Sequence, residues 1–235
     1  MNEIKIENLT IGYHSKIVAK GLTTTLSSGA LTCLIGRNGL GKSTLLKVLA
    51  GFIPPLSGQV IITFDGKDYD LSRMSKMALS RLVSVVLTDK VDIANVSVKD
   101  VVSMGRMPYT NFFGNLNKND EEIVLKAMNM TGISDFAGRD ISTLSDGERQ
   151  KVMIARALAQ QTPIILLDEP TAFLDYESKV ETMRLLHDLA SNMDKIVLAS
   201  THDLDIAVRI ADRMITINNG IKDVVTDPRV SLFKD

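Results

Sequence analysis

A glycine-rich stretch with the sequence GRNGLGKS, at positions 36–43, has the residue types and spacing of a phosphate-binding loop. It fits the pattern G-x-x-x-x-G-K-[ST], and it stands between an apolar run that predicts a strand and a leucine-rich run that predicts a helix. Glycines let the backbone wrap phosphate oxygens with its N–H groups, and the helix N-terminus adds positive potential. We therefore expect Lys42 to reach the β- and γ-phosphates of a nucleotide, and the Ser43 hydroxyl to coordinate Mg²⁺. The residues expected to hold the phosphates are Gly36, Arg37, Asn38, Gly39, Leu40, Gly41, Lys42, Ser43 and Thr44.

Two adjacent carboxylates follow a second predicted strand. The apolar run at 164–167 leads directly into Asp168 and Glu169. After a phosphate-binding loop, this pattern indicates that Asp168 holds Mg²⁺ through water and that Glu169 orients and polarises an attacking water molecule. The chemistry so indicated is phosphoryl transfer to water, which depends mainly on positioning and on stabilisation of charge.

A histidine follows a third predicted strand, at 196–200, in the sequence STHD. A lone histidine is more often structural, and we interpret His14 and His187 in that way. His202 differs from them, because ligands of open parallel sheets bind beyond the carboxyl ends of the strands. We therefore expect His202 to lie near the two carboxylates and to contact the γ-phosphate.

The elements that must position these groups alternate between strands and helices over most of the chain. Alternating or apolar runs predict strands at 3–8, 22–26, 31–35, 59–64, 82–87, 164–167 and 196–200. Apolar residues at helical spacing predict helices at 43–50, 98–104, 121–130, 148–160 and 178–190, with a loop at 105–119. This alternation favours a mostly parallel sheet that is covered by helices on both faces.

These elements together predict a single α/β domain over residues 1–235. Its core would be a mostly parallel sheet of the P-loop NTPase type, combined with an N-terminal antiparallel β subdomain. The core and the β subdomain would comprise residues 1–87 and 144–235, and a helical insert would occupy about residues 88–143.

The composition narrows the possible partners and surroundings. Lys and Arg total 27 against 28 Asp and Glu, so the formal net charge is -1, and we expect no nucleic acid partner. The single cysteine, Cys33, excludes an internal disulfide and is interpreted as a small buried hydrophobe. The N-terminal residues lack the apolar centre of a signal peptide, and no apolar run reaches the roughly 18 residues of a spanning helix. We therefore expect a cytoplasmic protein.

Five motifs together are similar in order and spacing to those of ATP-binding cassette (ABC) ATPases, along essentially the full chain. They are the phosphate-binding loop, LSDGERQK at 144–151, IILLDEP at 164–170, TAFLD at 171–175 and STHD at 200–203. The resemblance implies that the chain binds ATP and Mg²⁺ and hydrolyses ATP to ADP and phosphate. It further implies that Tyr13 stacks on the adenine, although a strand tyrosine can also serve packing alone. Asp175 would be the D-loop aspartate and His202 the switch histidine.

The segment LSDGE corresponds to the signature motif of that family, with Asp146 and Glu148 where Gly and Gln are commonest. In the family two cassettes associate head to tail, so the motif of one subunit meets the nucleotide held by the other. The resemblance thus implies that Ser145 and the Gly147 backbone bind the γ-phosphate of ATP on a second copy of the chain, or on a close relative. Alternatively, Ser145 could merely cap a helix. The residues assigned to this second site are Leu144, Ser145, Asp146, Gly147 and Glu148.

The segment at 96–133, followed by LAQQTPIILLDEPTAFLD, looks like the cassettes of iron-siderophore, haem and vitamin B12 importers. This implies transmembrane permease subunits as partners, a periplasmic or surface substrate-binding protein as an indirect partner, and a place at the cytoplasmic face of the membrane. The competing hypothesis is a soluble ABC ATPase that acts as a regulatory or nucleic-acid-processing clamp, and the near-neutral charge disfavours it. The transported substrate and the identity of the permease stay open.

The stretch GRMPY at 105–109 is the most characteristic part of this resemblance. Apolar side chains in and around it could contact a coupling helix of the membrane subunit, or could equally form the core of the insert. These residues are Met104, Met107, Tyr109, Phe112 and Phe113.

One position departs from the family pattern. After the strand at 82–87, cassettes of this family usually place a glutamine that touches Mg²⁺ and the attacking water, and this sequence has Thr88. A hydroxyl can serve as a metal ligand or act through a bridging water. Asp89 is a rival, because a carboxylate is a harder and charged ligand. In a third alternative Thr88 merely ends the strand.

Overall fold

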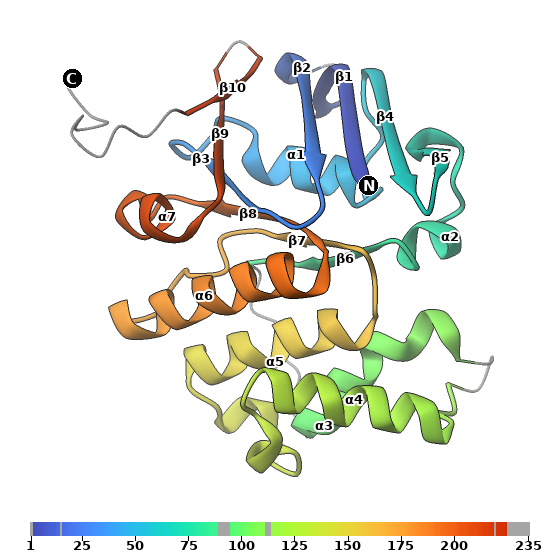
Figure 1. The fold of residues 1–235 in the computed structure, drawn as a ribbon, viewed down its shortest axis with the longest axis vertical. Coiled ribbons are helices and arrows are strands. Elements are labelled where there is room, and N and C mark those ends of the chain that lie inside the picture. The colour runs from blue at the N-terminus through green and yellow to red at the C-terminus, as the bar shows by residue number, and fades with distance from the viewer. Residues whose placement is uncertain (1, 15, 89–94, 111–113, 219, 225–235) are drawn as a thin grey trace.

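The computed structural model describes residues 2–14, 16–88, 95–110, 114–218 and 220–224 (Figure 1). The strands are β1 (Glu3–Tyr13), β2 (Lys16–Ser27), β3 (Leu31–Ile35), β4 (Ser57–Phe64), β5 (Lys67–Asp70), β6 (Val83–Val86), β7 (Ile164–Leu167), β8 (Ile196–Thr201), β9 (Arg213–Ile217) and β10 (Ile221–Asp223). The α-helices are α1 (Lys42–Leu49), α2 (Lys76–Ser80), α3 (Val98–Ser103), α4 (Lys118–Met130), α5 (Asp146–Ala159), α6 (Tyr176–Met193) and α7 (Leu204–Ile210). Short 3₁₀ helices are η1 (Leu71–Arg73), η2 (Met104–Tyr109), η3 (Ser134–Phe136) and η4 (Ile141–Thr143).

The strands form two sheets. The first has the order β2-β1-β4-β5, and its neighbouring strands are antiparallel. The second has the order β10-β9-β3-β8-β7-β6, in which the pairs are parallel except for β10 with β9. This arrangement confirms the predicted fold class, an α/β core with a mostly parallel sheet, an N-terminal antiparallel subdomain and a helical insert.

The central parallel sheet separates two hydrophobic cores, because successive side chains of a strand point to opposite faces. In β7, Ile164 and Leu166 join the core that contains α1, α2 and the antiparallel sheet, whereas Ile165 and Leu167 join the core that contains helices α3 to α7. Cys33 of β3 belongs to the second core and is fully buried, as predicted. Burial raises the pKa of its thiol to about 12. The phosphate-binding helix and the insert therefore lie on opposite faces of the sheet (Figure 1).

The insert lies between β6 and α5 in the sequence and is helical, as its apolar spacing predicts. Helix α5 packs against both α3 and α4 and also contacts β6, so it joins the insert to the central sheet. The predicted loop at 105–119 was only partly right, because η2 covers its first residues and α4 begins at Lys118. Gly105 suggested a loop, but here it permits close packing, since a Cβ there would lie 2.2 Å from the Arg156 carbonyl oxygen. The predicted boundaries of the insert, after residue 87 and after residue 143, stay a prediction.

Several short elements were not predicted, namely β5, α2, α7, β9 and β10. The two helices have five and seven residues, and the three strands have three to five residues. Segments of this length carry little periodicity, so their sequences give only a weak signal. The structure of the three strands depends on pairing with a neighbouring strand, since β5 pairs with β4 and β10 with β9. Strand β9, for example, is fixed by its parallel pairing with β3.

A buried arginine connects the elements of the insert. Arg106 in η2 is only 4% exposed, and its Nε donates to Asp120 Oδ1 of α4 at 2.9 Å. Its Nη1 donates to the Ala159 carbonyl at 2.8 Å and to Gln161 Oε1 at 3.0 Å, both at the end of α5. The guanidinium also stacks on the Tyr109 ring, 4.2 Å from its centroid. One side chain thus holds η2, α4 and α5 together.

We expect Arg106→Lys to lower the free energy of unfolding by about 2 kcal/mol. A lysine ammonium cannot reproduce the planar fork that reaches Asp120 and Ala159 together, and it stacks less well on the ring. Urea unfolding at an unchanged m value measures this loss. Arg81→Lys is the matched control, because Arg81 is exposed and donates to the same segment through the Pro108 carbonyl. Equal destabilisation by both substitutions would contradict the role assigned to Arg106.

Candidate functional site

The loop between β3 and α1 is shaped by glycines. Gly36, Gly39 and Gly41 have φ angles of 144°, 86° and 99°, in the left-handed region that glycine adopts without strain. A Cβ on Gly41 would lie 2.9 Å from a methyl group of Val18 in β2. The loop can therefore keep its backbone close to β2 and turn its N–H groups toward an anion at the start of α1.

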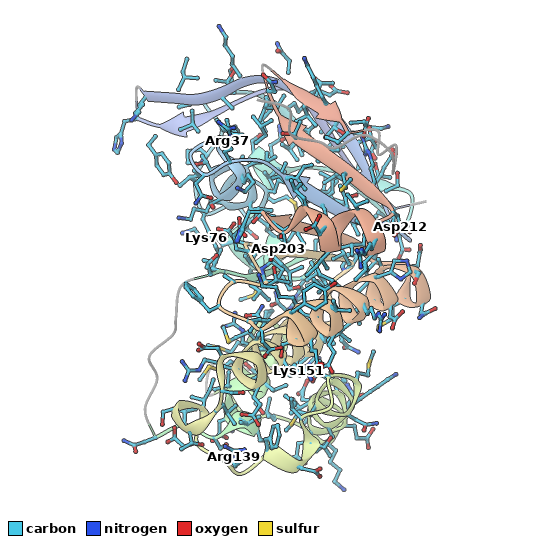
Figure 2. The ribbon with its side chains drawn as sticks, turned by 90° about the vertical axis from the view of Figure 1, so that its left-hand side faces the viewer. Arg37, Lys76, Arg139, Lys151, Asp203 and Asp212 are labelled. Carbon is cyan, nitrogen blue, oxygen red and sulfur yellow. The ribbon has the colours of Figure 1, made fainter. Side chains whose placement is uncertain are left out.

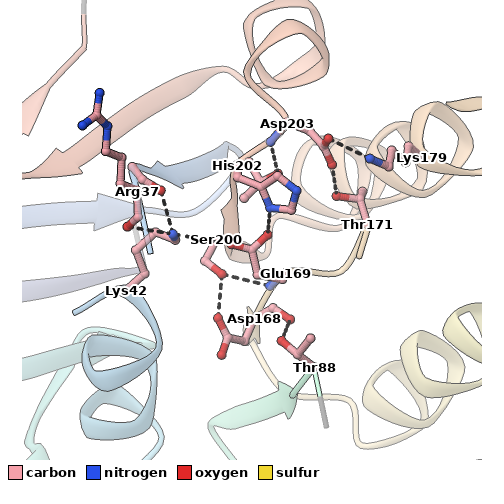
Figure 3. Close-up of polar contacts among 12 residues, drawn as sticks. Arg37, Lys42, Thr88, Asp168, Glu169, Thr171, Lys179, Ser200, His202 and Asp203 are labelled. Atoms are coloured by element: carbon pink, nitrogen blue, oxygen red, sulfur yellow. Dashed lines mark hydrogen bonds and ion pairs between the residues drawn. The ribbon is translucent and has the colours of Figure 1, made fainter. Parts of the chain in front are cut away.

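Lys42, the first residue of α1, reaches back across this loop. Its Nζ donates to the Gly36 carbonyl at 2.7 Å and to the Arg37 carbonyl at 3.4 Å. The same Nζ lies 3.5 Å from Glu169 Oε1, and the lysine side chain is only 5% exposed. The structure thus brings the predicted phosphate-binding cation beside the predicted catalytic carboxylate (Figure 3).

The two carboxylates stand where β7 ends, as predicted. Asp168 is 7% exposed, and its Oδ1 accepts from Ser200 Oγ at 2.7 Å. The Glu169 N–H donates to the same hydroxyl at 2.9 Å, so Ser200 of β8 fixes both residues. Glu169 has a φ of 48°, an unusual backbone conformation for a residue other than glycine. Such local strain is found preferentially at functional sites.

His202 follows β8 and contacts Glu169, with 2.7 Å between Nδ1 and Oε2. The contact arises because β7 and β8 are parallel neighbours, so their carboxyl ends meet at one edge of the sheet. Glu169 therefore lies between a cation and an imidazole. Its Oε1 is buried and accepts no hydrogen bond from the described residues, and its 3.5 Å ion pair with Lys42 leaves room for a hydrogen bond from a polar group entering the site.

A groove of about 970 Å³ adjoins the phosphate-binding loop. Its walls include Ile17 and Val18 of β2, the loop residues Gly39 and Leu40, and His202. Tyr13 lies at the end of β1, where the preceding residue pairs with Ile17, and its side chain is 42% exposed. The apolar wall and the nearby exposed aromatic ring suit a flat base next to the phosphates.

The LSDGE segment begins α5, on the opposite face of the sheet from α1. Ser145 is the N-cap, and its Oγ accepts from the Glu148 N–H at 3.3 Å, while its own N–H donates to Glu148 Oε2 at 2.8 Å. The Ser145 hydroxyl also donates to Glu148 Oε2 at 3.0 Å, and the bonds that this carboxylate accepts from the Ser145 N–H and hydroxyl lower the pKa of Glu148 below its usual value. In Figure 2, Asp203 lies between Arg37 of the phosphate loop, above it, and Lys151 of α5, below it. The capping role considered for Ser145 is therefore present in the structure, and LSDGE and the phosphate loop belong to different halves of the molecule.

Thr88 lies at the end of β6, beside the carboxylates. Its Oγ1 donates to the Asp168 carbonyl at 2.7 Å. It also lines a small cavity of about 50 Å³ together with Glu169 and Gln150. Thr88 thus contacts the catalytic segment through the backbone of Asp168, and its hydroxyl oxygen keeps lone pairs for a further partner. Its rival, Asp89, lies outside the described residues.

Sequence reasoning missed four polar residues that hold this site together, namely Ser200, Thr171, Lys179 and Asp203. Two of them stand in the STHD motif, where a polar residue at the end of an apolar strand was a usable signal for Ser200. Lys179 gave no such signal, because a helix lysine is usually a solvated surface residue. Asp175, which the family resemblance identifies with the D-loop aspartate, is the N-cap of α6 and accepts from the Ser178 N–H at 2.9 Å.

Comparison with known proteins connects this arrangement to a family. The family described as ABC transporter matches residues 19–172. The chain is 41% identical over 211 residues to the cobalamin import ATP-binding protein BtuD of Halobacterium salinarum, covering 90% of this chain and 52%, about half, of that relative. It is 39% identical over 219 residues to the achromobactin transport ATP-binding protein CbrD of Dickeya dadantii, covering 93% of this chain and 80% of that relative.

Two solved structures of ABC transporter proteins are also similar to this chain. A metal-chelate type ABC transporter in an inward-facing conformation is similar with a TM-score of 0.81 and 30% identity, over 95% of this chain and 83% of that one. The dimeric ATP-binding cassette MJ0796, in a post-hydrolysis state with ADP and phosphate, is similar with a TM-score of 0.78 and 25% identity, over 94% of this chain and 97% of that one. Within the described residues, no helix combines the length and hydrophobicity needed to cross a membrane.

Proposed function

This chain belongs to the ABC transporter family of ATP-hydrolysing cassettes, and we propose that it drives import of an iron-siderophore, haem or cobalamin-type substrate. The observation that carries the proposal is the similarity to import cassettes named for cobalamin and achromobactin, at 41% and 39% identity over at least 90% of this chain. The soluble regulatory or nucleic-acid-processing clamp gains no support from these relatives. In the proposed importer the chain acts at the cytoplasmic face of a membrane, bound to permease subunits. A substrate-binding protein delivers the substrate to these permease subunits.

ATP would bind with its phosphates on the loop from Gly36 to Thr44 and with its adenine near Tyr13. The Lys42 ammonium already donates to the Gly36 and Arg37 carbonyls of the loop, and from there it would contact the β- and γ-phosphates. The 970 Å³ groove beside the loop has room for the base and ribose.

Mg²⁺ fits the oxygen ligands present here. Asp168 is held in place by Ser200, with one carboxylate oxygen bonded to that hydroxyl, and Ser43 offers an exposed hydroxyl at the start of α1. When bound, the ion would neutralise charge on the phosphates. Thr88 is proposed as a weaker contributor that acts through its bond to the Asp168 carbonyl.

Hydrolysis would depend on Glu169 and His202. The Glu169 carboxylate accepts a hydrogen bond from the attacking water, which forms the new P–O bond as the bond from the γ-phosphorus to the β–γ bridging oxygen breaks. The water proton passes through the carboxylate to the phosphate that is released. Lys42 stabilises the charge that develops on the γ-phosphoryl oxygens, and His202 contacts the same group from the adjoining strand end.

A second copy of the chain would complete each nucleotide site. Ser145 is exposed at the N-terminus of α5, and the Gly147 backbone lies in its first turn, so both can meet a phosphate held by another subunit. The solved cassette at 25% identity is itself dimeric with ADP and phosphate, which supports this proposal. Asp175 at the N-cap of α6 would lie near the same interface.

The permease would dock on the exposed side of η2. Met104, Met107 and Tyr109 are 37%, 66% and 36% exposed, although large apolar side chains usually avoid water. The buried hydrogen bonds of Arg106 hold η2 against α4 and α5, so these three residues form a preorganised apolar surface for a helix of the membrane subunit. Phe112 and Phe113, the other residues predicted for this contact, lie outside the described residues.

Two measurements test the proposed function together. The tagged chain is isolated from native membranes in mild detergent, and uptake of labelled ferric siderophore or cobalamin is compared in cells with active and with Glu169→Gln protein. We expect a polytopic membrane protein to co-purify and uptake to stop in the variant. An active ATPase that binds no membrane protein, with uptake unaffected by the substitution, would show that the importer assignment is wrong.

Thr88→Val is expected to lower ATP turnover about threefold to tenfold, because it removes a hydrogen bond of roughly 0.5–1.5 kcal/mol to the Asp168 carbonyl. Thr88→Ser restores the hydroxyl and should restore turnover, and Thr88→Gln should preserve or raise it. Steady-state hydrolysis with and without the membrane partner measures these effects. Asp89→Asn should have little effect. If Thr88→Val leaves partner-stimulated turnover unchanged and Asp89→Asn abolishes it, Asp89 has the role instead.

A further inference from the structure

Asp203 occupies the N-cap position of α7 but does not cap that helix. Aspartate at an N-cap ordinarily accepts a hydrogen bond from an N–H group in the first turn of its own helix. Here its side chain makes no such bond, and both carboxylate oxygens are bonded to other elements. The Asp203 side chain thus stabilises contacts with the segment after β7 and with α6, and not the first turn of α7.

Those contacts come from two neighbouring segments (Figure 3). Thr171, which is fully buried in the segment after β7, donates its hydroxyl to Asp203 Oδ2 at 2.7 Å. Lys179 of α6 donates to Asp203 Oδ1 at 2.8 Å, and the side chains of this ion pair are only 22% and 17% exposed. Burial pushes the pKa of Asp203 upward, but the bonds from Lys179 and Thr171 outweigh it and hold the pKa below its usual value. Asp203 is therefore an anion held by two donors.

The ion pair belongs to a continuous series of contacts between two parts of the proposed nucleotide site. The Lys179 N–H donates to the Asp175 carbonyl at 3.0 Å, so the lysine stands one turn inside the N-cap of α6. Its ammonium holds Asp203, whose sequence neighbour His202 lies 2.7 Å from Glu169. The Asp203 N–H is also fixed, by a bond to Thr201 Oγ1 at 3.0 Å. The backbone around His202 therefore has little freedom to move independently of α6.

We infer that Asp203 is a positioning residue that holds His202 against Glu169, and that Lys179 makes this contact depend on the position of the first turns of α6. A shift of α6 at its Asp175 end would be transmitted through the ion pair to the histidine. The inference rests on the proposed roles of Glu169 and His202. It assigns Asp203 and Lys179 no contact with ATP.

Removing the ion pair should therefore slow chemistry without weakening nucleotide binding. In Asp203→Asn and in Lys179→Met we expect kcat for ATP hydrolysis to fall about tenfold, because small displacements of a reacting group are costly, while KM for ATP changes less than about twofold. Lys179→Arg restores a cation and should recover most of the turnover. The double variant should be no slower than the slower single variant, since both substitutions break one contact.

Glu181→Gln is the matched control, because Glu181 lies two residues further along α6 and pairs with Lys151 near the surface. It should leave kcat unchanged. The folded fraction of every variant is measured by nucleotide binding and by thermal unfolding, so that loss of folded protein is not read as loss of kcat. Wild-type kcat in correctly folded Lys179→Met, additive losses in the double variant, or an equal loss in the control would each overturn the inference. A wild-type protein without ATP hydrolysis would instead contradict the proposed function.

Discussion

Glu169→Gln is expected to reduce steady-state ATP hydrolysis by roughly 10²- to 10³-fold while ATP binding persists. Glu169 Oε1 lies 3.5 Å from Lys42 Nζ, and Oε2 lies 2.7 Å from His202 Nδ1. A carboxylate in this position can polarise an attacking water and accept its proton, whereas a carboxamide of nearly the same shape cannot. Glutamine keeps the side-chain length, so it preserves the contact with the imidazole and isolates the effect of charge.

The substituted protein should also accumulate as an ATP-bound dimer. If bound γ-phosphate bridges two subunits, a subunit pair that cannot hydrolyse ATP has no route to the open state. Turnover, binding of a fluorescent ATP analogue and size-exclusion chromatography with ATP measure the three expected results. The corresponding charge removal at the exposed Glu181 should change none of them. Near-normal hydrolysis by Glu169→Gln would show that the catalytic role belongs to another residue.

The parts of this site that the sequence could predict are those with a local cause. The glycines of the phosphate loop are needed for the backbone conformations found at positions 36, 39 and 41. Asp168, Glu169 and His202 could be placed together because each follows a buried strand, and parallel strands end at the same edge of the sheet. In both cases a short segment carries the whole signal.

The parts that escaped prediction depend on partners far away in the sequence. The Thr88 hydroxyl bonds to the Asp168 carbonyl 80 positions later, and Lys179 pairs with Asp203 24 positions later. Nothing in the local pattern of a threonine at a strand end or a lysine on a helix identifies such a partner. Arg106 is similar, because an arginine in a Gly-Pro segment reads as solvated until its carboxylate partner is placed in space. Prediction from local patterns therefore reached the reacting groups but not the residues that position them.

Ser145→Arg is expected to reduce hydrolysis by roughly 10²-fold while each subunit still binds ATP, because the nucleotide that Ser145 meets belongs to the other subunit. The bulky cation would stand where the phosphate of the partner's ATP must enter. The substitution also removes the N-cap of α5, at a cost of about 1 kcal/mol in stability. Ser97→Arg controls for that cost, since the Ser97 hydroxyl caps α3 in the same way, by accepting from the Asp100 N–H at 3.1 Å. It should leave hydrolysis largely intact.

A mixture of Ser145→Arg with Lys42→Ala decides whether the two motifs act in the same subunit or between subunits. Lys42→Ala removes the ammonium that spans the phosphate loop, so neither variant alone should hydrolyse ATP. In a mixed dimer, the intact Lys42 of one subunit faces the intact Ser145 of the other, and one complete site results. ATP-dependent association and partial recovery of turnover are therefore expected in the mixture, measured by size-exclusion chromatography and phosphate release. If both motifs served a site within one chain, mixing could restore nothing, so the absence of recovery with both proteins folded would contradict the shared site.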